Sequence, residues 1–330
     1  MKKLFIAVLS MATLASCFQS EFAVDQAIDF NTYVGSTTKA IDPSITTATI
    51  NKFYVWGNTQ GDHADDAPIV PIFEGVEVGY TDGAWKYAVE HTKYWIAGNK
   101  YNFAAVVNGV VDNTALVNGL PETISYTAGT DLDLLYADAK NIVAKASGNE
   151  KVAFTFEHLL SKAVFTFTNT TEKKTDVPAN IYKVTDIKIS GLGKSATYDV
   201  TDGWGTSTGT YEANFGHIVD ANEANEDAAA IGIAEQESGK SNYEHLLIPG
   251  THTVTITCKI TLYDNGAVVD EIPYSQTING LTLQKGTAYN FSLKAGLEQT
   301  IEFDVNPVND WNNPYFDVNT PVQGHDNPAI

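Results

Sequence analysis

The chain has 330 residues, of which 43% are apolar, so it is long enough to bury the cores of two domains of ordinary size. Charged residues make up only 18%, and 40 acidic residues against 20 basic ones give a net charge of −20. A surface this acidic repels nucleic acid and anionic bilayers, so nucleic acid is excluded as a partner.

The amino terminus is typical of a bacterial lipoprotein signal peptide, which we assign to residues 1–17. Lys2 and Lys3 precede an apolar run over 4–15, which is shorter than the ~20 residues of a membrane-spanning helix. The run ends in Leu-Ala-Ser-Cys, a lipobox-like sequence that predicts cleavage before Cys17 and lipidation of its sulfur. Acyl chains such as palmitate anchor a protein at about 0.8 kcal/mol per buried CH₂. An ordinary signal peptide with a chance cysteine is the alternative.

From residue 47 onward, short segments alternate apolar and polar residues, with turn residues between them. This spacing predicts an all-β protein of two β-sandwich domains in tandem. Expected strands, in chain order, include 48–56, 100–107, 123–126, 152–156, 182–189, 289–293 and 301–305. A small, polar break near 146–150 predicts domains over 40–148 and 149–311, and a short helix is expected over 228–235.

Cys258 is the only cysteine besides Cys17, so no intrachain disulfide survives lipidation. It shares its parity with Val254, Ile256 and Ile260, while Thr and Lys occupy the other parity. We therefore expect Cys258 to point into a core as a small hydrophobe.

Four segments resemble the fimbrillin family of type V pilus subunits, and they occur along the chain in the order expected for that family. Residues 154–167 are similar to its F-x-H-x-L-S-K-V/A-x-F run, and residues 94–103 to its Y-W-x-x-G-x-x-Y-x-F segment. Residues 133–137 resemble its D-L-L/M-Y-A segment, and residues 301–311 its closing strand and Asp-Trp pair. Behind a lipobox, the four together identify the chain as a member of this family.

The resemblance implies two transthyretin-like, Greek-key sandwiches and a precursor held at the outer membrane by acylated Cys17 before it enters the fimbrium. It implies that a trypsin-like protease removes an amino-terminal segment, and that a neighbouring subunit fills the groove by donor-strand exchange. Other pilus subunits, that protease, outer-membrane lipid and a host or bacterial surface receptor for adhesion are the implied partners. Family members are commonly cut after Arg, which this chain lacks, so Lys39 before Ala40 is the substitute in a polar stretch.

Donor-strand exchange requires two segments with similar side-chain patterns, and the sequence contains such a pair. In the pro-segment 18–39, one face of the expected removable strand carries Ile28, Phe30, Thr32 and Val34. In the tail 312–330, one face of the candidate donor strand carries Phe316, Val318, Thr320 and Val322. The tail could instead form one more edge strand or stay loose, and Pro321 cannot donate a ladder hydrogen bond.

No motif of catalysis is present, so an enzyme, a cofactor and a metal site are not expected. The acidic loop 62–66 could hold Ca²⁺ but is better explained as a solvated loop. His158 is expected to be a hydrogen-bonded structural histidine, and Trp85, Trp95 and Trp311 to be core or edge aromatics. A non-polymerising, lipid-anchored fimbrial accessory and a glycan-binding surface lipoprotein remain the competing functions.

Overall fold

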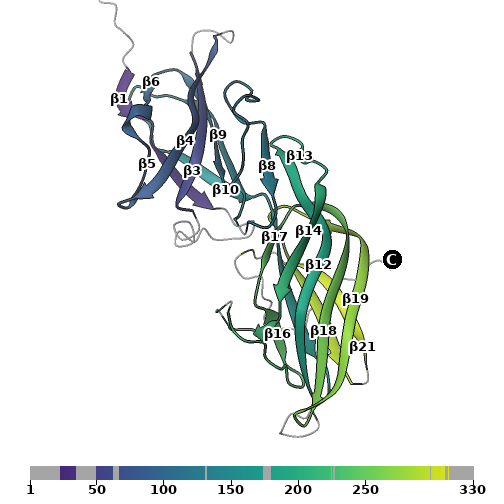
Figure 1. The fold of residues 1–330 in the computed structure, drawn as a ribbon. Helices are drawn as coiled ribbons and strands as arrows, with labels where there is room; N and C mark the ends of the chain where they lie inside the picture. The colour runs from purple at the N-terminus through teal and green to yellow at the C-terminus, as the bar shows by residue number, and fades with distance from the viewer. Residues whose placement is uncertain are drawn as a thin grey trace, which may run out of the picture.

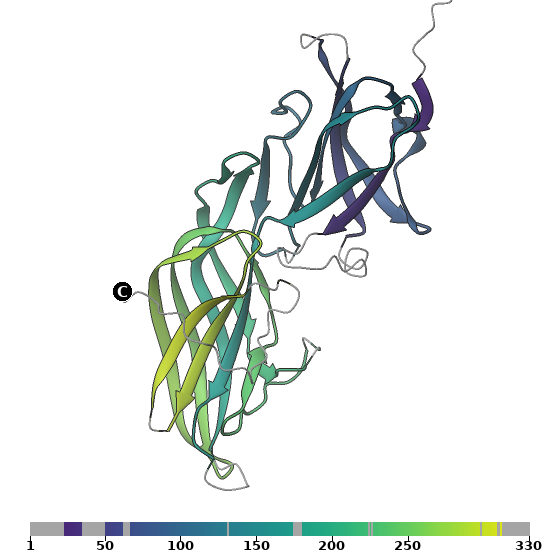
Figure 2. The same ribbon diagram turned by 180° about the vertical axis from the view of Figure 1, so that it is seen from behind.

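The computed structural model describes residues 23–34, 50–61, 67–130, 132–173, 180–223, 225, 227–297, 299–308 and 311. They form an all-β protein with two lobes that meet end to end (Figure 1), and Figure 2 shows the same arrangement from behind. This confirms the expected all-β class. One short 3₁₀ helix, η1 (Val89–His91), lies among the strands.

The first lobe contains a two-stranded sheet, β1-β6, and a seven-stranded sheet in the order β2-β10-β9-β7-β3-β4-β5. Alternation drives this arrangement: in β10, Val152, Phe154 and Phe156 are buried and the residues between them are exposed. The seven-stranded sheet curls around its own core, so that Phe30 of β2 and Phe73 of β4 meet with ring centroids 5.4 Å apart. The strands are β1 Ala23–Ala27, β2 Phe30–Val34, β3 Lys52–Gln60, β4 Ile69–Thr81, β5 Ala84–Lys86, β6 Tyr94–Ile96, β7 Lys100–Val107, β9 Leu135–Val143 and β10 Val152–His158.

The second lobe packs two six-stranded sheets face to face. One sheet has the order β15-β16-β11-β20-β21, with β17 on β11, and the other has the order β13-β12-β18-β19, with β14 and β8 on β12. Phe165 and Phe291 from the first of these sheets share a buried cluster with Ile189 and Ile256 from the second. The strands are β8 Thr123–Thr127, β11 Ser161–Asn169, β12 Asn180–Asp199, β13 Gly203–Trp204, β14 Thr208–Gly216, β15 Ile218–Asp220, β16 Ser238–Ser241, β17 His245–Leu247, β18 Gly250–Asp264, β19 Ala267–Leu283, β20 Ala288–Gly296 and β21 Gln299–Val308.

The expected domain boundary after residue 148 does not coincide with the point at which the chain passes from the core of the first lobe to that of the second. Strand β10 (Val152–His158) pairs with β2 and β9 in the first lobe, and Phe154 and Phe156 belong to the core of that lobe. Apart from β8, which pairs with β12, the chain enters the second lobe only after Leu159 and Leu160. The polar break near 146–150 is a turn between β9 and β10, because turns within a sheet and linkers between domains use the same small, polar residues.

The helix expected over 228–235 is absent from this described stretch, which is irregular, with one bridge residue and a turn at its end. Ile233 forms an isolated antiparallel bridge with Tyr182 of β12 and is 2% exposed. Gly232 lies so close to Ile181 that an added Cβ would come within 2.3 Å of that side chain. Burial of Ile233 against the sheet therefore overrides the helix propensity of the preceding alanines.

The junction between the lobes has a shared strand pair and a hydrophobic cluster of its own. Strand β8 lies within the expected first domain in sequence, yet its five residues pair with residues 195–199 of β12. The junction cluster combines Trp56 and Tyr126 with Leu159, Leu160 and Trp311 among its buried members. A shared strand pair over a continuous apolar core holds the two lobes together.

Candidate functional site

The amino-terminal segment 23–34 crosses from one sheet of the first lobe to the other. Strand β1 pairs antiparallel with β6, and β2 then pairs parallel with β10 as the end strand of the seven-stranded sheet. The crossing occurs at Ile28 and Asp29: the Ile28 amide donates to the Lys93 carbonyl (2.8 Å), and the Val152 amide donates to the Asp29 carbonyl (2.8 Å). The segment therefore ties the two sheets together.

The side chains of this segment that face inward are plugs in the core of the first lobe. Ile28 is 0% exposed, Phe30 1% and Thr32 5%, which is the face that the sequence pattern predicts. The Phe30 ring stacks on Phe154, with 5.7 Å between centroids, and meets Phe103 edge to face at 5.9 Å. The side chain of Val34, the fourth residue of the predicted face, lies outside the described residues.

Two polar contacts fix the register of the segment. Gln26 and Asn149 bond reciprocally: Gln26 Nε2 donates to the Asn149 carbonyl (2.5 Å), and the Asn149 amide donates to Gln26 Oε1 (2.7 Å). The Tyr87 hydroxyl donates to the Ile28 carbonyl (2.7 Å), and burial raises the pKa of Tyr87 to about 12, so the phenol keeps its proton at neutral pH. The sequence pattern contained no signal for these contacts, because the partners are distant in the chain.

The arrangement of this site allows it to bind an extended polypeptide strand. Strand β10 offers β2 a parallel ladder, and the core offers pockets for alternate side chains, which is the arrangement used in recognition by β-strand addition. If residues 23–34 left, β10 would become a free edge above an open aromatic core. An exposed edge of this kind is a template for another strand.

Several predicted site residues lie outside the described residues. These are the lipidation residue Cys17, the cleavage pair Lys39 and Ala40, the acidic loop 62–66, and the candidate donor residues Phe316, Val318, Thr320 and Val322. Their roles therefore stay predictions.

His158 is a structural residue at the junction of the lobes, as predicted. Its Nδ1 is in hydrogen-bonding contact with Asp133 Oδ2, and its ring stacks on Trp311 with 4.1 Å between centroids. Trp311 is 9% exposed, and Trp85 and Trp95 are also buried, which confirms their expected role as core aromatics. The meeting of the family-like segments 133–137 and 301–311 at His158 was not visible in the pattern of either segment.

Cys258 lies in β18 inside the core of the second lobe and is 5% exposed, as the parity of its strand predicts. Burial raises the pKa of its thiol to about 12, which makes it unreactive at neutral pH.

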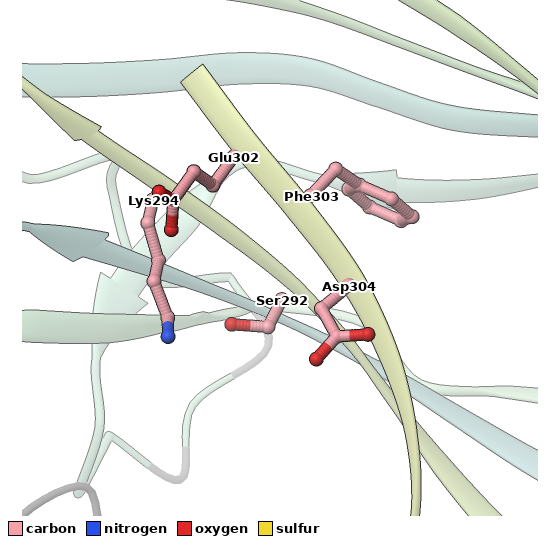
Figure 3. A pocket seen from close by; sticks show the side chains of 5 residues that line it. All are labelled: Ser292, Lys294, Glu302, Phe303 and Asp304. Atoms are coloured by element: carbon pink, nitrogen blue, oxygen red, sulfur yellow. The ribbon is translucent and has the colours of Figure 1, made fainter. Parts of the chain in front are cut away.

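A shallow cavity of about 340 Å³ lies over β20 and β21, and its lining is mostly polar. Figure 3 shows Ser292, Lys294, Glu302 and Asp304 on one side of the strand pair, with Phe303 projecting to the other side. Ser292 pairs with Asp304 and Lys294 with Glu302 across the two strands. This is the ordinary alternation of side chains along a strand pair.

Among the residues that the structure describes, no group of three or more His, Cys, Asp or Glu side chains could hold a metal ion. The described part of the chain also contains no helix that is long and apolar enough to cross a membrane.

Comparison with solved structures shows proteins of similar fold. A fimbrial protein from Bacteroides vulgatus superimposes with a TM-score of 0.61 at 14% identity, over 86% of this chain and 98% of that chain. Lower similarity links the chain to a protein of proposed cell adhesion function from Bacteroides ovatus (TM-score 0.44, 16% identity, 84% of this chain, 95% of that chain). It also links the chain to a fimbrial assembly protein from Parabacteroides distasonis (TM-score 0.40, 12% identity, 86% of this chain, 98% of that chain).

The family itself follows from the sequence: the model of the fimbrillin-like family matches residues 38–311, and the chain belongs to that family. Membership supports a pilus-related role at the cell surface, and structural rather than catalytic work with other pilus subunits. No curated protein matches the sequence.

Proposed function

We propose that this chain is the lipid-anchored precursor of a pilus subunit that polymerises by protease-triggered donor-strand exchange and serves adhesion. One observation carries the proposal: the amino-terminal segment plugs Ile28 and Phe30 into the first-lobe core from the end strand of a sheet. A segment at the end of the sheet is the one whose removal leaves the other ladders intact.

In the proposed sequence of events, Cys17 carries the lipid that holds the precursor at the outer membrane. A trypsin-like protease cuts between Lys39 and Ala40, and the released segment takes β1 and β2 with it. The opened core then exposes the faces of Phe73, Phe103 and Phe154 that contact Phe30.

A neighbouring subunit fills the opening with the tail face Phe316, Val318, Thr320 and Val322. Fully burying a large apolar side chain contributes about 1.5–3 kcal/mol, so the three apolar plugs of this face, with the β10 ladder, make a stable junction. The tail repeats the order of the departing plugs, with Thr at the third position in both. This match supports the tail as the donor.

The test is limited tryptic digestion of the purified precursor, followed by electron microscopy for fibres and by SDS gels of unboiled samples. We expect the new amino terminus to read Ala40-Ile41-Asp42, and we expect SDS-resistant ladders to form. Lys39→Gln should block both, and truncation after Asn313 should allow cleavage but abolish the ladders. Fibres whose subunits still begin at Cys17 would refute the cleavage step.

The absence of Arg favours a second candidate, a fimbrial accessory that keeps its lipid and does not polymerise. It predicts that the precursor resists digestion at Lys39 and that no fibres form. Both candidate functions include adhesion to a surface receptor. Binding of the digested protein to host or bacterial cells would test for that receptor.

A further inference from the structure

The end of the first lobe that lies farthest from the second carries exposed apolar side chains, which we call the distal rim. Strand pairing defines this end: β9 begins at Leu135 beside His158, at the junction, and finishes at Val143 beside Lys100. Figure 1 shows β1 and β6 at the same end. The rim consists of Ile69, Val70, Tyr94, Ile96 and Val143, with exposed fractions of 37%, 49%, 51%, 42% and 52%.

Hydrogen bonds of Asn99 bring together the chain segments that carry these residues. Its amide donates to the Ile96 carbonyl (3.1 Å), and its side-chain Nδ2 donates to Thr59 Oγ1 (3.2 Å). Thr59 pairs with Val70 across β3 and β4, and the Asn99 carbonyl accepts from the residue that follows Val143 (2.9 Å). The segments that carry the rim residues therefore meet near Asn99. Exposed apolar residues gathered in this way are a common sign of a protein contact.

The removable segment covers part of the rim. Strand β1 pairs with β6, with Ala27 opposite Tyr94 and Ala23 opposite Ile96. When the segment is removed, β6 loses its pairing strand, and the neighbourhood of Tyr94 and Ile96 opens further. In the register that matches Phe316 to Ile28, the donor residues opposite this strand are 311–315, which begin at Trp311.

The direction of β2 determines where a donor enters. Because β2 runs parallel to β10, with Phe30 beside Val152 and Val34 beside Phe156, it runs from the distal rim toward the junction. A donor tail that replaces β2 residue by residue therefore enters the first lobe at the distal rim. The five residue steps from Trp311 to Phe316 span at most about 18 Å, since an extended chain covers at most ~3.6 Å per residue.

Trp311 is itself buried at the junction of its own subunit, stacked on His158. Because the connection from Trp311 to Phe316 is short, the two subunits must lie close together. The junction between the lobes of the donor subunit must then lie against the distal rim of the acceptor. We propose that the distal rim is the docking surface for a second copy of this chain, which contributes the surface around Trp311. Such a contact joins two different surfaces and so extends into a filament. This inference rests on the proposed function and adds the contact that accompanies strand exchange.

The test separates docking from strand uptake. Ile96→Lys and Val143→Lys place a charge in the rim, while Val268→Lys is the matched control, because Val268 is 54% exposed at the opposite end of the second lobe. Each full-length precursor is lightly digested with trypsin. Uptake of a fluorescent peptide of sequence 314–322 is then measured beside fibre growth by light scattering.

We expect the rim variants to take up the peptide like the unsubstituted chain but to polymerise about tenfold more slowly, because an apolar contact cannot bury an unpaired ammonium without cost. The Val268→Lys control should polymerise normally. Normal fibre growth in both rim variants would overturn the docking surface while leaving strand exchange intact. No peptide uptake by any chain would overturn strand exchange itself, and the docking surface with it.

A second measurement covers a rim variant that fails to fold. A photo-crosslinking amino acid in place of Ile96 should join neighbouring subunits in fibres, with the cross-link mapping near Trp311 of the other copy. The same amino acid in place of Val268 should give no such product. Cross-links that map elsewhere, or that are equally strong from position 268, would contradict the proposal.

Discussion

Phe30 and Phe154 stack with their ring centroids 5.7 Å apart and 17° between the ring planes. The contact joins the amino-terminal segment to the strand that leads into the second lobe. Phe30 also meets Phe53, Phe73 and Phe103, so one ring from a segment at the edge of the sheet is the centre of an aromatic core. The stability of the first lobe should therefore depend on this segment.

Phe30→Ala should lower the free energy of unfolding of the first lobe by about 3–5 kcal/mol, the cost of a large cavity in a packed core. Urea denaturation followed by tryptophan fluorescence measures the loss, because Trp85 and Trp95 lie in the same core. The control is Asp29→Ala in the same segment, where the side chain is exposed and the change should stay within about 0.5 kcal/mol. Equal effects of the two substitutions would mean that the plug contributes no packing energy.

Tyr87→Phe should destabilise the first lobe by about 1–2 kcal/mol, because it removes the hydroxyl that donates to the Ile28 carbonyl and leaves the ring packing in place. The same substitution should accelerate tryptic release of the amino-terminal segment. The time course of digestion on gels measures this rate, and Tyr243→Phe, at an exposed tyrosine of the second lobe, is the control. An unchanged digestion rate would contradict a role for this hydrogen bond in retaining the segment.

Stability should also depend on pH through Tyr87. Burial raises the pKa of its phenol in the folded chain to about 12, against an ordinary value of 10.0. Below about pH 10 both states hold the proton and this group adds no pH dependence; above it the unfolded state loses the proton first, so stability falls as the pH rises toward 12. Denaturation curves of Tyr87→Phe should therefore decline less steeply over this interval.

Cys258 should resist alkylation in the folded protein and react rapidly in urea. The thiol is 5% exposed, and burial raises its pKa to about 12, so little thiolate forms at pH 8.5. Iodoacetamide labelling read by mass spectrometry tests this in a Cys17→Ser background, which leaves one thiol. Rapid labelling in buffer would show that β18 opens locally far more often than its place in the core implies.

Trp311→Ala should cost about 3 kcal/mol at the junction, while Trp311→Phe should keep much of the stack on His158 and cost less. Hydrogen exchange of the β8–β12 amides reports the junction directly, because these strands pair across it. Protection there should fall in Trp311→Ala and recover in Trp311→Phe. Unchanged protection in both would mean that the tryptophan does not hold the lobes together.

Local pattern was sufficient for much of the fold. The alternation around Cys258 and in 152–156 predicted both the strands and their buried faces, because the side-chain period of a strand depends only on neighbouring residues. The same reasoning placed Ile28, Phe30 and Thr32 on one inward face. It failed at 228–235, where a short helix was expected and Ile233 is instead buried in an isolated bridge with Tyr182.

The domain boundary and the junction depended on contacts that no local pattern contains. The break near 146–150 has the composition of a linker but acts as a turn, and the true crossing at Leu159 and Leu160 is apolar because it lies inside the junction cluster. Likewise, His158 meets Asp133 and Trp311 only after both lobes have formed.

By itself, the sequence determined the β-strands, their inward faces and membership of the fimbrillin-like family, since each depends on residue type and short-range period. Only the tertiary structure decided that residues 23–34 join two sheets, that β10 belongs to the first lobe and that apolar residues gather at the distal rim. The physical reason is that strand partners are chosen by long-range burial and hydrogen bonding, which bring together segments whose separation in the chain carries no signal.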